Sequence, residues 1–418
     1  MAQVVKHISL LAGVQNPAVA LRGEQLAQLP VLHNAWLLLE GEDIAAFGTM
    51  DQWNEQLERV PQQWDASGRM VLPAWCDSHT HLVFARSRED EFRDKIQGLT
   101  YAEIAAKGGG ILNSARVLQQ TGEDELFRLA WLRLQEAIQL GTGAIEIKSG
   151  YGLTLEAELK MLRVIRRLQQ RSAVTIKSTF LGAHAVPAAY KDNREEYIRL
   201  IIEEMLPAIA AEQLADYIDV FCEQGFYTPE ETELICRAGQ QYGLRPKLHV
   251  NQLTSMGGVE AGIRANAVSL DHLEVLTHDE IGQLAQWSGM CTLLPTAAFF
   301  LRMPFQPARK LIDAGAAVAL ASDFNPGSSP SFNMNLVVAM SCIGMRMLPE
   351  EAINAATING AFAMECAGEL GSIAVGKKAN FIITRPVPSL AYLPYAFGTN
   401  LVEQVFIKGE LMANAKEN

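Results

Sequence analysis

Cysteine is scarce in this sequence of 418 residues, and the few cysteines are widely spaced. The six are Cys76, Cys222, Cys236, Cys291, Cys342 and Cys366, and no two of them form a CxxC pair. This spacing excludes a thiolate zinc site and a disulfide framework, so we expect free thiols in a reducing compartment.

Long apolar runs are absent as well. No stretch of about 18 or more apolar residues occurs, which excludes a membrane-spanning helix and gives no reason to expect a membrane partner. Residues 1–16 lack the charged start and the small-residue cleavage site of a secretory signal. The protein is therefore expected in the cytoplasm.

Positive charge is in deficit, because 35 Lys and Arg stand against 47 Asp and Glu, a formal net charge of -12. This is the wrong sign for a protein that binds phosphate backbones, so nucleic acid is not an expected partner. Hydrophobic residues make up 49% of the chain, as in ordinary globular proteins. The length exceeds the roughly 250–300 residues of a single core, which predicts a large domain with an accessory part.

From residue 70 onward, short apolar runs alternate with longer helical patterns, which is typical of βα units around a parallel sheet. The runs are Met70–Asp77, Gly143–Lys148, Ala173–Phe180, Tyr217–Cys222, Pro246–His249, Ala267–Leu270, Met290–Leu294 and Ala316–Ala321. Helical periods lie between them, for example in Glu156–Gln170 and in a helix that begins after Thr228 as its N-cap, with Glu231 behind it. Eight such units predict an α/β fold, the (β/α)8 TIM barrel.

Both ends of the chain carry strand patterns instead. Val4–Leu11, Ala35–Leu39 and Asp43–Phe47 precede the barrel, and Ala379–Thr384 and Val402–Ile407 follow it. Because chain termini often lie close together, we expect the two ends to pair into a small β-sandwich. The predicted division is 1–69 for the N-terminal part of this composite sandwich, 70–366 for the barrel and 367–418 for the C-terminal part.

Five of the eight histidines fall at or just after the ends of predicted barrel strands, and they are His79, His81, His184, His249 and His272. Active sites of this fold lie at the C-terminal mouth of the barrel, where side chains from different strand ends converge. The other three, His7, His33 and His278, are expected on the surface or in structural roles.

A metal site is the first consequence of this arrangement. His79 and His81 lie two residues apart in an extended segment, which places both imidazoles on one face. His249 and Asp323, the latter just past the eighth strand, complete a set of ligands that suits one divalent metal, zinc or iron. A metal held in this way lowers the pKa of bound water to about 7, so the sequence predicts hydrolysis.

Several peptides along the whole chain resemble those of known enzymes. Asp65–Gly68, Val71–Pro73 and Asp77–His81 are similar to the entry segment of the amidohydrolase superfamily. More specific stretches resemble the imidazolonepropionase family of histidine degradation. These are His79–Phe84 with Arg88 and Glu91–Phe92, Gly108–Ile111, Glu146–Gly152, Thr179–His184 and Ser322–Ser328.

The resemblance implies hydrolytic opening of a small-molecule substrate, 4-imidazolone-5-propanoate, to N-formimidoyl-L-glutamate. The enzyme would be a metal-dependent barrel with a composite β-sandwich, usually a homodimer. Asp323 would ligate the metal and also carry the proton of the attacking water to the leaving nitrogen. His272 and His184 are the candidates for stabilising the developing oxyanion.

Substrate-binding residues follow from the same resemblance. Arg88 offers a bidentate fork for the propionate, and Tyr151 can bond the carboxylate or the ring. His184 would also contact the substrate, and Gln252, whose amide donates and accepts, is expected at the ring edge. Polar groups of substrate or product would be held by Asn325, Gly327 and Ser328.

Two positions at which this chain differs from relatives bear on the mechanism. Two-metal relatives generally have a carboxylated lysine at the fourth strand, where this chain has Val220–Gln224 without a lysine, so a single metal is expected. Some relatives carry Glu in place of Gln252, and since an amide cannot act as a base, base catalysis falls to Asp323. Lys148 and Lys177, on the second and third strands, are expected to form structural ion pairs.

Two alternatives stay open at this point. One is another mononuclear cyclic-amide hydrolase or nucleobase deaminase of the same superfamily, although Arg88, Tyr151 and His184 would have no clear partner on a neutral base. The other is a catalytically silent metal-binding scaffold, which has no need of the intact histidines and Asp323.

Overall fold

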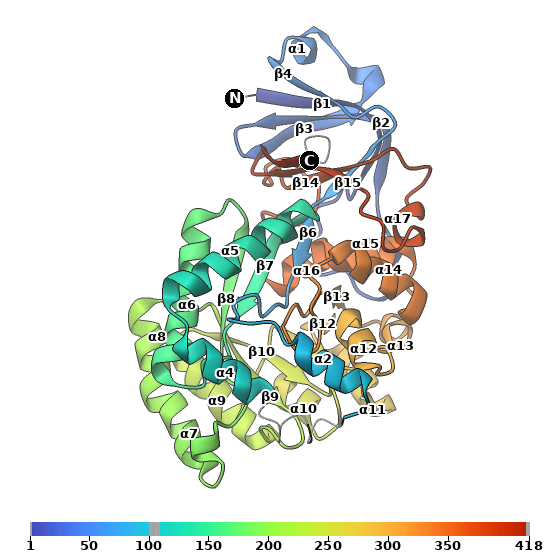
Figure 1. The fold of residues 1–418 in the computed structure, drawn as a ribbon. Coiled ribbons are helices and arrows are strands. Elements are labelled where there is room, and N and C mark those ends of the chain that lie inside the picture. The colour runs from blue at the N-terminus through green and yellow to red at the C-terminus, as the bar shows by residue number, and fades with distance from the viewer. Residues whose placement is uncertain (1, 100–102, 104–108, 415–418) are drawn as a thin grey trace.

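The computed structural model describes residues 2–99, 103 and 109–414, and it consists of a barrel with a second sheet at one end (Figure 1). The barrel sheet has eight parallel strands in chain order. They are β6 (Trp75–Asp77), β7 (Thr142–Lys148), β8 (Thr175–Ala183), β9 (Tyr217–Cys222), β10 (Arg245–Val250), β11 (Ser269–His272), β12 (Met290–Leu293) and β13 (Val318–Leu320). The predicted (β/α)8 fold is confirmed.

Helices cover the outside of the barrel (Figure 1). They are α2 (Glu89–Ile96), α4 (Ile111–Gln120), α5 (Glu123–Gln139), α6 (Leu155–Arg171), α7 (Arg194–Leu200), α8 (Leu206–Glu212), α9 (Pro229–Gln241), α10 (Gly258–Arg264), α11 (His278–Gln286), α12 (Pro295–Leu301), α13 (Ala308–Ala314), α14 (Met334–Met345), α15 (Pro349–Ala356) and α16 (Ile358–Ala363). The predicted start of α9 is confirmed, because Thr228 and Glu231 form a reciprocal capping box.

The first and last barrel strands are joined through side chains. The carboxylate of Asp77 accepts hydrogen bonds from the backbone N–H and the hydroxyl of Ser322, at 2.9 and 2.5 Å. Just beyond, the backbone N–H of Asp323 donates to the carbonyl of His79 at 3.0 Å. These bonds bring the two ends of the barrel sheet together beneath the site described below.

The two ends of the chain pair in one sheet, as predicted, and Figure 1 shows both termini in this part of the molecule. Its strands are β1 (Ala2–Ala12), β2 (Val31–Glu40), β3 (Asp43–Thr49), β4 (Gln62–Asp65), β5 (Met70–Pro73), β14 (Phe381–Thr384), β15 (Val402–Ile407) and β16 (Glu410–Asn414). β5 joins the halves by pairing parallel with β1 and antiparallel with β14. Val5, Leu37, Phe381 and Phe406 are among the residues of its separate hydrophobic core.

The first predicted barrel strand needs a correction. Met70–Pro73 belongs to the terminal sheet, and only Trp75–Asp77 enters the barrel. Both pieces are buried along their whole length, so burial does not distinguish them. The switch occurs at Ala74, whose N–H donates to the carbonyl of Asn380. The domain boundaries at residues 69/70 and 366/367 remain predictions.

All six cysteines are free, as predicted. Within the described ranges, no helix has the length and apolar character needed to cross a membrane. Gly108 of the glycine-rich motif lies outside the described residues.

Candidate active site

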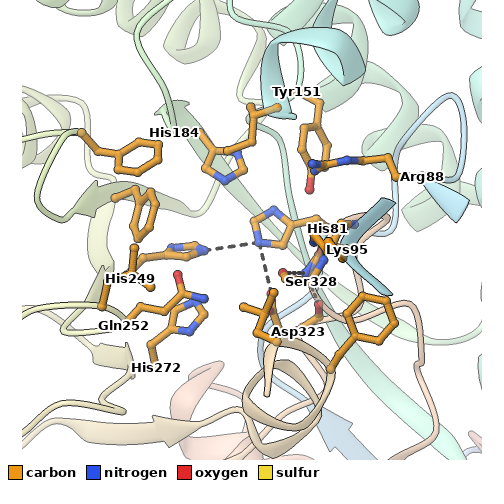
Figure 2. Close-up of a pocket in the computed structure, with 18 of the residues that line it drawn as sticks. His81, Arg88, Lys95, Tyr151, His184, His249, Gln252, His272, Asp323 and Ser328 are labelled. Carbon is orange, nitrogen blue, oxygen red and sulfur yellow. Dashed lines mark hydrogen bonds and ion pairs between the residues drawn. The ribbon is translucent and has the colours of Figure 1, made fainter. Parts of the chain in front are cut away.

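A cavity of about 750 Å³ opens at the C-terminal mouth of the barrel (Figure 2). Its wall includes all but one of the predicted site residues. These are His81, Arg88, Tyr151, His184, His249, Gln252, His272, Asp323, Asn325, Gly327 and Ser328. The exception, His79, is fully buried behind the cavity.

The predicted metal ligands converge at the inner end of this cavity. Oδ1 of Asp323 lies 3.4 Å from Nε2 of His79 and 3.6 Å from Nε2 of His81. Nε2 of His81 is in turn 3.3 Å from Nε2 of His249. Nε2 of His79 is buried without a hydrogen-bond partner among the described residues. An unpartnered imidazole nitrogen within a set of nitrogen and carboxylate donors fits a divalent metal ion.

Local backbone structure aims these side chains. Thr80, between His79 and His81, donates its hydroxyl to the carbonyl of Glu146 at 2.6 Å and so fixes the extended segment. Asp323 and His272 both have positive φ, 51° and 85°, which costs conformational energy in a residue with a Cβ. Such backbone is found where surrounding structure imposes it, commonly at active sites.

Two carboxylates that the sequence analysis missed orient the histidines. Oδ2 of Asp271 lies 2.6 Å from Nδ1 of His79, and Oδ2 of Asp219 lies 2.8 Å from Nδ1 of His249. Each imidazole thereby turns Nε2 toward the other ligands, as metal-binding histidines commonly do. The available signal was an acidic residue in or directly after an apolar run, because Asp219 lies inside Tyr217–Cys222 and Asp271 follows Ala267–Leu270.

Burial sets the charge of the histidines at the inner end. It lowers the pKa of His79, His81 and His249 well below the usual value, so all three are neutral at pH 7, the form that ligates a metal. Burial also lowers the pKa of His272, but nearby carboxylates, foremost that of Glu274, outweigh it and raise the value to about 9.

His184 is also neutral, with a defined tautomer. Burial lowers its pKa to about 4, and its Nδ1 lies 3.0 Å from the carbonyl of Gly150. Because a carbonyl only accepts, Nδ1 carries the proton and Nε2 is an acceptor. The buried carboxylate of Glu158 accepts backbone N–H bonds from Gly150, Gly152 and Leu153, which fixes the loop that presents Tyr151.

Besides the histidines, three basic side chains line the cavity, Arg88, Lys95 and the exposed Arg302, and the first two mark its outer end. Nε of Arg88 donates to Oε2 of Glu91 at 2.9 Å, and Oε1 of Glu91 accepts the N–H of Gly110 at 2.9 Å. Lys95, which the sequence analysis missed, donates from Nζ to the carbonyl of Gly327 at 3.1 Å. Lys95 follows Arg88 by seven residues, or two turns of α2, and this spacing was the signal that could have revealed it.

Gly327 leaves space for Arg88, because a Cβ at this position would lie 2.2 Å from Nη1 and would displace the guanidinium. Asn325 holds the same loop: its Oδ1 accepts the N–H of Gly327 and of Ser328 at 2.8 and 2.7 Å. Its Nδ2 donates to the carbonyl of Asp323 at 2.7 Å. The Asn325 amide therefore orders the loop between the two ends of the cavity.

Gln252 lies on a loop anchored from the neighbouring strand end. The buried carboxylate of Glu223, just after β9, accepts the backbone N–H of Leu253 at 2.8 Å and of Thr254 at 3.3 Å. Glu223 is thus a further residue that the sequence analysis missed, and it positions Gln252 at the cavity wall.

The fold and the site define an amidohydrolase. Residues 238–412 match the model of the amidohydrolase family. A solved triazine hydrolase variant superposes with a TM-score of 0.75 at 15% identity, covering 99% of this chain and 95% of that one. A guanine deaminase from E. coli gives 0.74 at 13% identity, covering 99% of both chains. At these identities the two structures support the fold alone.

Sequence relatives are more specific. The chain is 53% identical over 413 residues to an imidazolonepropionase of Flavobacterium johnsoniae, covering 99% of this chain and 100% of that one. It is 52% identical to the imidazolonepropionase of Christiangramia forsetii, covering 99% of this chain and 100% of that one. It is 41% identical to the imidazolonepropionase of a Geobacillus species, covering 94% of this chain and 93% of that one. The chain belongs to the imidazolonepropionase family.

Proposed function

We propose that this chain hydrolyses the cyclic amide of 4-imidazolone-5-propanoate to N-formimidoyl-L-glutamate, a step of histidine degradation. The observation that carries the proposal is the polarity of the cavity. A set of metal ligands lies at its inner end, and two cations, Arg88 and Lys95, lie at its outer end. A substrate with a reactive ring and a carboxylate tail matches that division, whereas a neutral nucleobase leaves the cations unused.

The reaction adds water to the ring carbonyl and breaks its bond to the ring nitrogen. One divalent metal, zinc or iron, held by His79, His81, His249 and Asp323, would supply a Lewis acid and lower the pKa of water. Asp323 accepts the proton of the attacking water and delivers it to the leaving nitrogen. A single metal fits the end of β9, which has Phe221 and Cys222 and no lysine.

The two remaining histidines take different roles in this proposal. The raised pKa of His272, about 9, favours its protonated form, and in that form it would donate to the developing oxyanion. His184 presents an acceptor nitrogen to the cavity, so we place it against a ring N–H of the substrate rather than at the oxyanion. Gln252 contacts the ring edge through an amide that donates and accepts.

The propionate is held at the outer end. Arg88 offers N–H groups beyond those used by Glu91, and Tyr151 and Ser328 lie on the same cavity wall. Asn325 and Gly327 contribute through the loop, Asn325 by ordering it and Gly327 by leaving space for Arg88.

We also propose a homodimer in the cytoplasm. The six free thiols fit a reducing compartment, and the dimer follows from the family resemblance. No nucleic acid or membrane partner is part of the proposal.

The proposal is tested by anaerobic incubation of the purified protein with freshly generated 4-imidazolone-5-propanoate and mass spectrometry of the product. We expect N-formimidoyl-L-glutamate from the unmodified protein, none above background from Asp323→Asn, and no deamination of guanine. Absence of product from a protein that holds metal would refute the substrate, and turnover of guanine would favour a deaminase.

A further inference from the structure

Among the buried charged side chains of the barrel strands, five are linked by ion pairs beside the metal ligands. They are Glu146 and Lys148 on β7, Asp219 on β9, Lys247 on β10 and Asp271 on β11. All five are buried. Buried charges are costly unless each is paired, so the arrangement of the pairs shows what each charge supports.

Lys148 is the centre of this cluster. Its Nζ lies 2.6 Å from Oε1 of Glu146, 2.9 Å from Oδ2 of Asp219 and 3.6 Å from Oδ2 of Asp271. An ammonium group has three N–H donors, and three carboxylate oxygens surround it. The Oδ2 atoms of Asp219 and Asp271 are also the atoms that face Nδ1 of His249 and of His79.

We infer that Lys148 is a positioning residue for the metal site: its ammonium bridges the two carboxylates that orient His79 and His249. The inference rests on the proposed function, because it takes these histidines as metal ligands. Without the bridge, the two buried carboxylates lose their shared counter-ion at Oδ2, the atom that faces the imidazole. Apart from the imidazole, each then keeps among the described residues only a hydrogen bond to Oδ1, from Ser269 Oγ to Asp271 at 2.6 Å and from the His249 N–H to Asp219 at 3.1 Å. Metal affinity should then fall, since outer partners of ligating histidines are commonly worth 10- to 100-fold in affinity.

Removal of Lys148 can in principle raise the metal affinity instead of lowering it, which makes the inference testable. A buried ammonium repels a divalent cation, so a lysine that merely happened to lie there would weaken metal binding. Its removal would then raise the affinity. The sign of the change separates a positioning residue from an incidental charge.

Lys247 provides a matched control within the same cluster. Its Nζ lies 2.6 Å from Oε2 of Glu146 and donates to the carbonyls of Ala363 and Ser78 at 2.8 and 3.3 Å. Among the described residues no ion pair joins it to Asp219 or Asp271. Removing either lysine together with the charge of Glu146 leaves the net charge of the cluster unchanged.

The experiment compares Glu146→Gln/Lys148→Met with Glu146→Gln/Lys247→Met. Zinc affinity is measured by competition with a chromophoric chelator, and the stability of the metal-free proteins by chemical denaturation. We expect the Lys148 variant to bind zinc at least about tenfold more weakly than the Lys247 variant. If the Met variant does not fold, Lys148→Gln with Glu146→Gln replaces it.

The outcomes are distinct. Equal or tighter zinc binding by the Lys148 variant, or equal losses in both variants, would overturn the role of Lys148. Failure of the unmodified protein to bind zinc or ferrous iron would instead overturn the metal site and with it the proposed function.

Discussion

The two ends of the cavity are built differently. At the inner end, His79 and His249 are buried and each is backed by a carboxylate within 2.8 Å. At the outer end, Arg88 and Lys95 lie beside apolar side chains of α2, where Phe92 is 43% and Ile96 56% exposed. The inner end has a fixed geometry that suits catalysis. The outer end presents positive charge for substrate binding, on side chains that fewer buried partners hold in place. Variants at the inner end should therefore affect turnover, and variants at the outer end should affect substrate affinity.

The largest loss of activity is expected from substitution of Asp323. Asp323→Asn keeps the shape of the side chain but removes its capacity to move a proton, so kcat should fall by about 10³-fold or more. Steady-state kinetics with the metal content measured in parallel checks this. A decrease below tenfold at full metal occupancy would assign the proton transfer to another group.

The second prediction concerns how the stability of the folded protein depends on pH through His184. The pKa of His184 is about 4 in the folded protein, below its value near 6.5 in an unfolded chain, so the unfolded state binds the proton first as the pH falls. This stability is present above pH 6.5 and is lost toward pH 4, by roughly 3 kcal/mol.

Chemical denaturation of the chelator-treated protein at several pH values measures this loss. His184→Gln, which cannot take up the proton, should show a shallower dependence over the same range. Identical slopes for the two proteins would show that burial of His184 does not contribute.

A smaller effect, on substrate affinity, is expected from variants at the outer end of the cavity. Arg88→Ala should raise KM for the propionate substrate about 10- to 100-fold, because charge-assisted hydrogen bonds contribute roughly 1.5–3 kcal/mol. The KM of a ring analogue without the carboxylate should not change. Equal losses on both compounds would remove Arg88 from propionate binding.

Two variants serve as controls for Arg88. Glu91→Gln leaves the guanidinium in place and should raise KM much less. Gly327→Ala places a methyl group against Nη1 of Arg88 and should reproduce the Arg88→Ala effect in part.

The smallest change in KM is expected from substitution of Lys95. Its ammonium already donates to the carbonyl of Gly327 and is only partly buried, so Lys95→Met should raise KM about threefold and leave kcat unchanged. The increase should shrink at high salt, because salt screens a charge that is partly exposed to solvent. A salt-independent increase would indicate lost packing instead.

Much of this fold could be predicted because parallel barrel strands are buried on both faces and read as short apolar runs. The exception, Met70–Pro73, is equally apolar but pairs in the terminal sheet. No property of the four residues distinguishes the two sheets, since the choice depends on β1 and β14, which lie far away in the sequence.

The site was predictable where a residue follows a strand end, as with His79, His81 and Asp323. Asp219 and Asp271 were not predicted, because their roles depend on contacts between strands. The ion pairs predicted for Lys148 are confirmed, but its place between these two carboxylates likewise depends on contacts between strands. The tautomer of His184 likewise depends on the carbonyl of Gly150, a backbone group that no sequence pattern reports.

The most direct test of a single catalytic metal is a metal titration of the chelator-treated protein, with turnover of 4-imidazolone-5-propanoate measured at each step. We expect no turnover without metal and a linear rise that ends at one equivalent of zinc or ferrous iron per chain. Turnover that persists without metal, or that rises until two equivalents are bound, would contradict a single metal site at the inner end of the cavity.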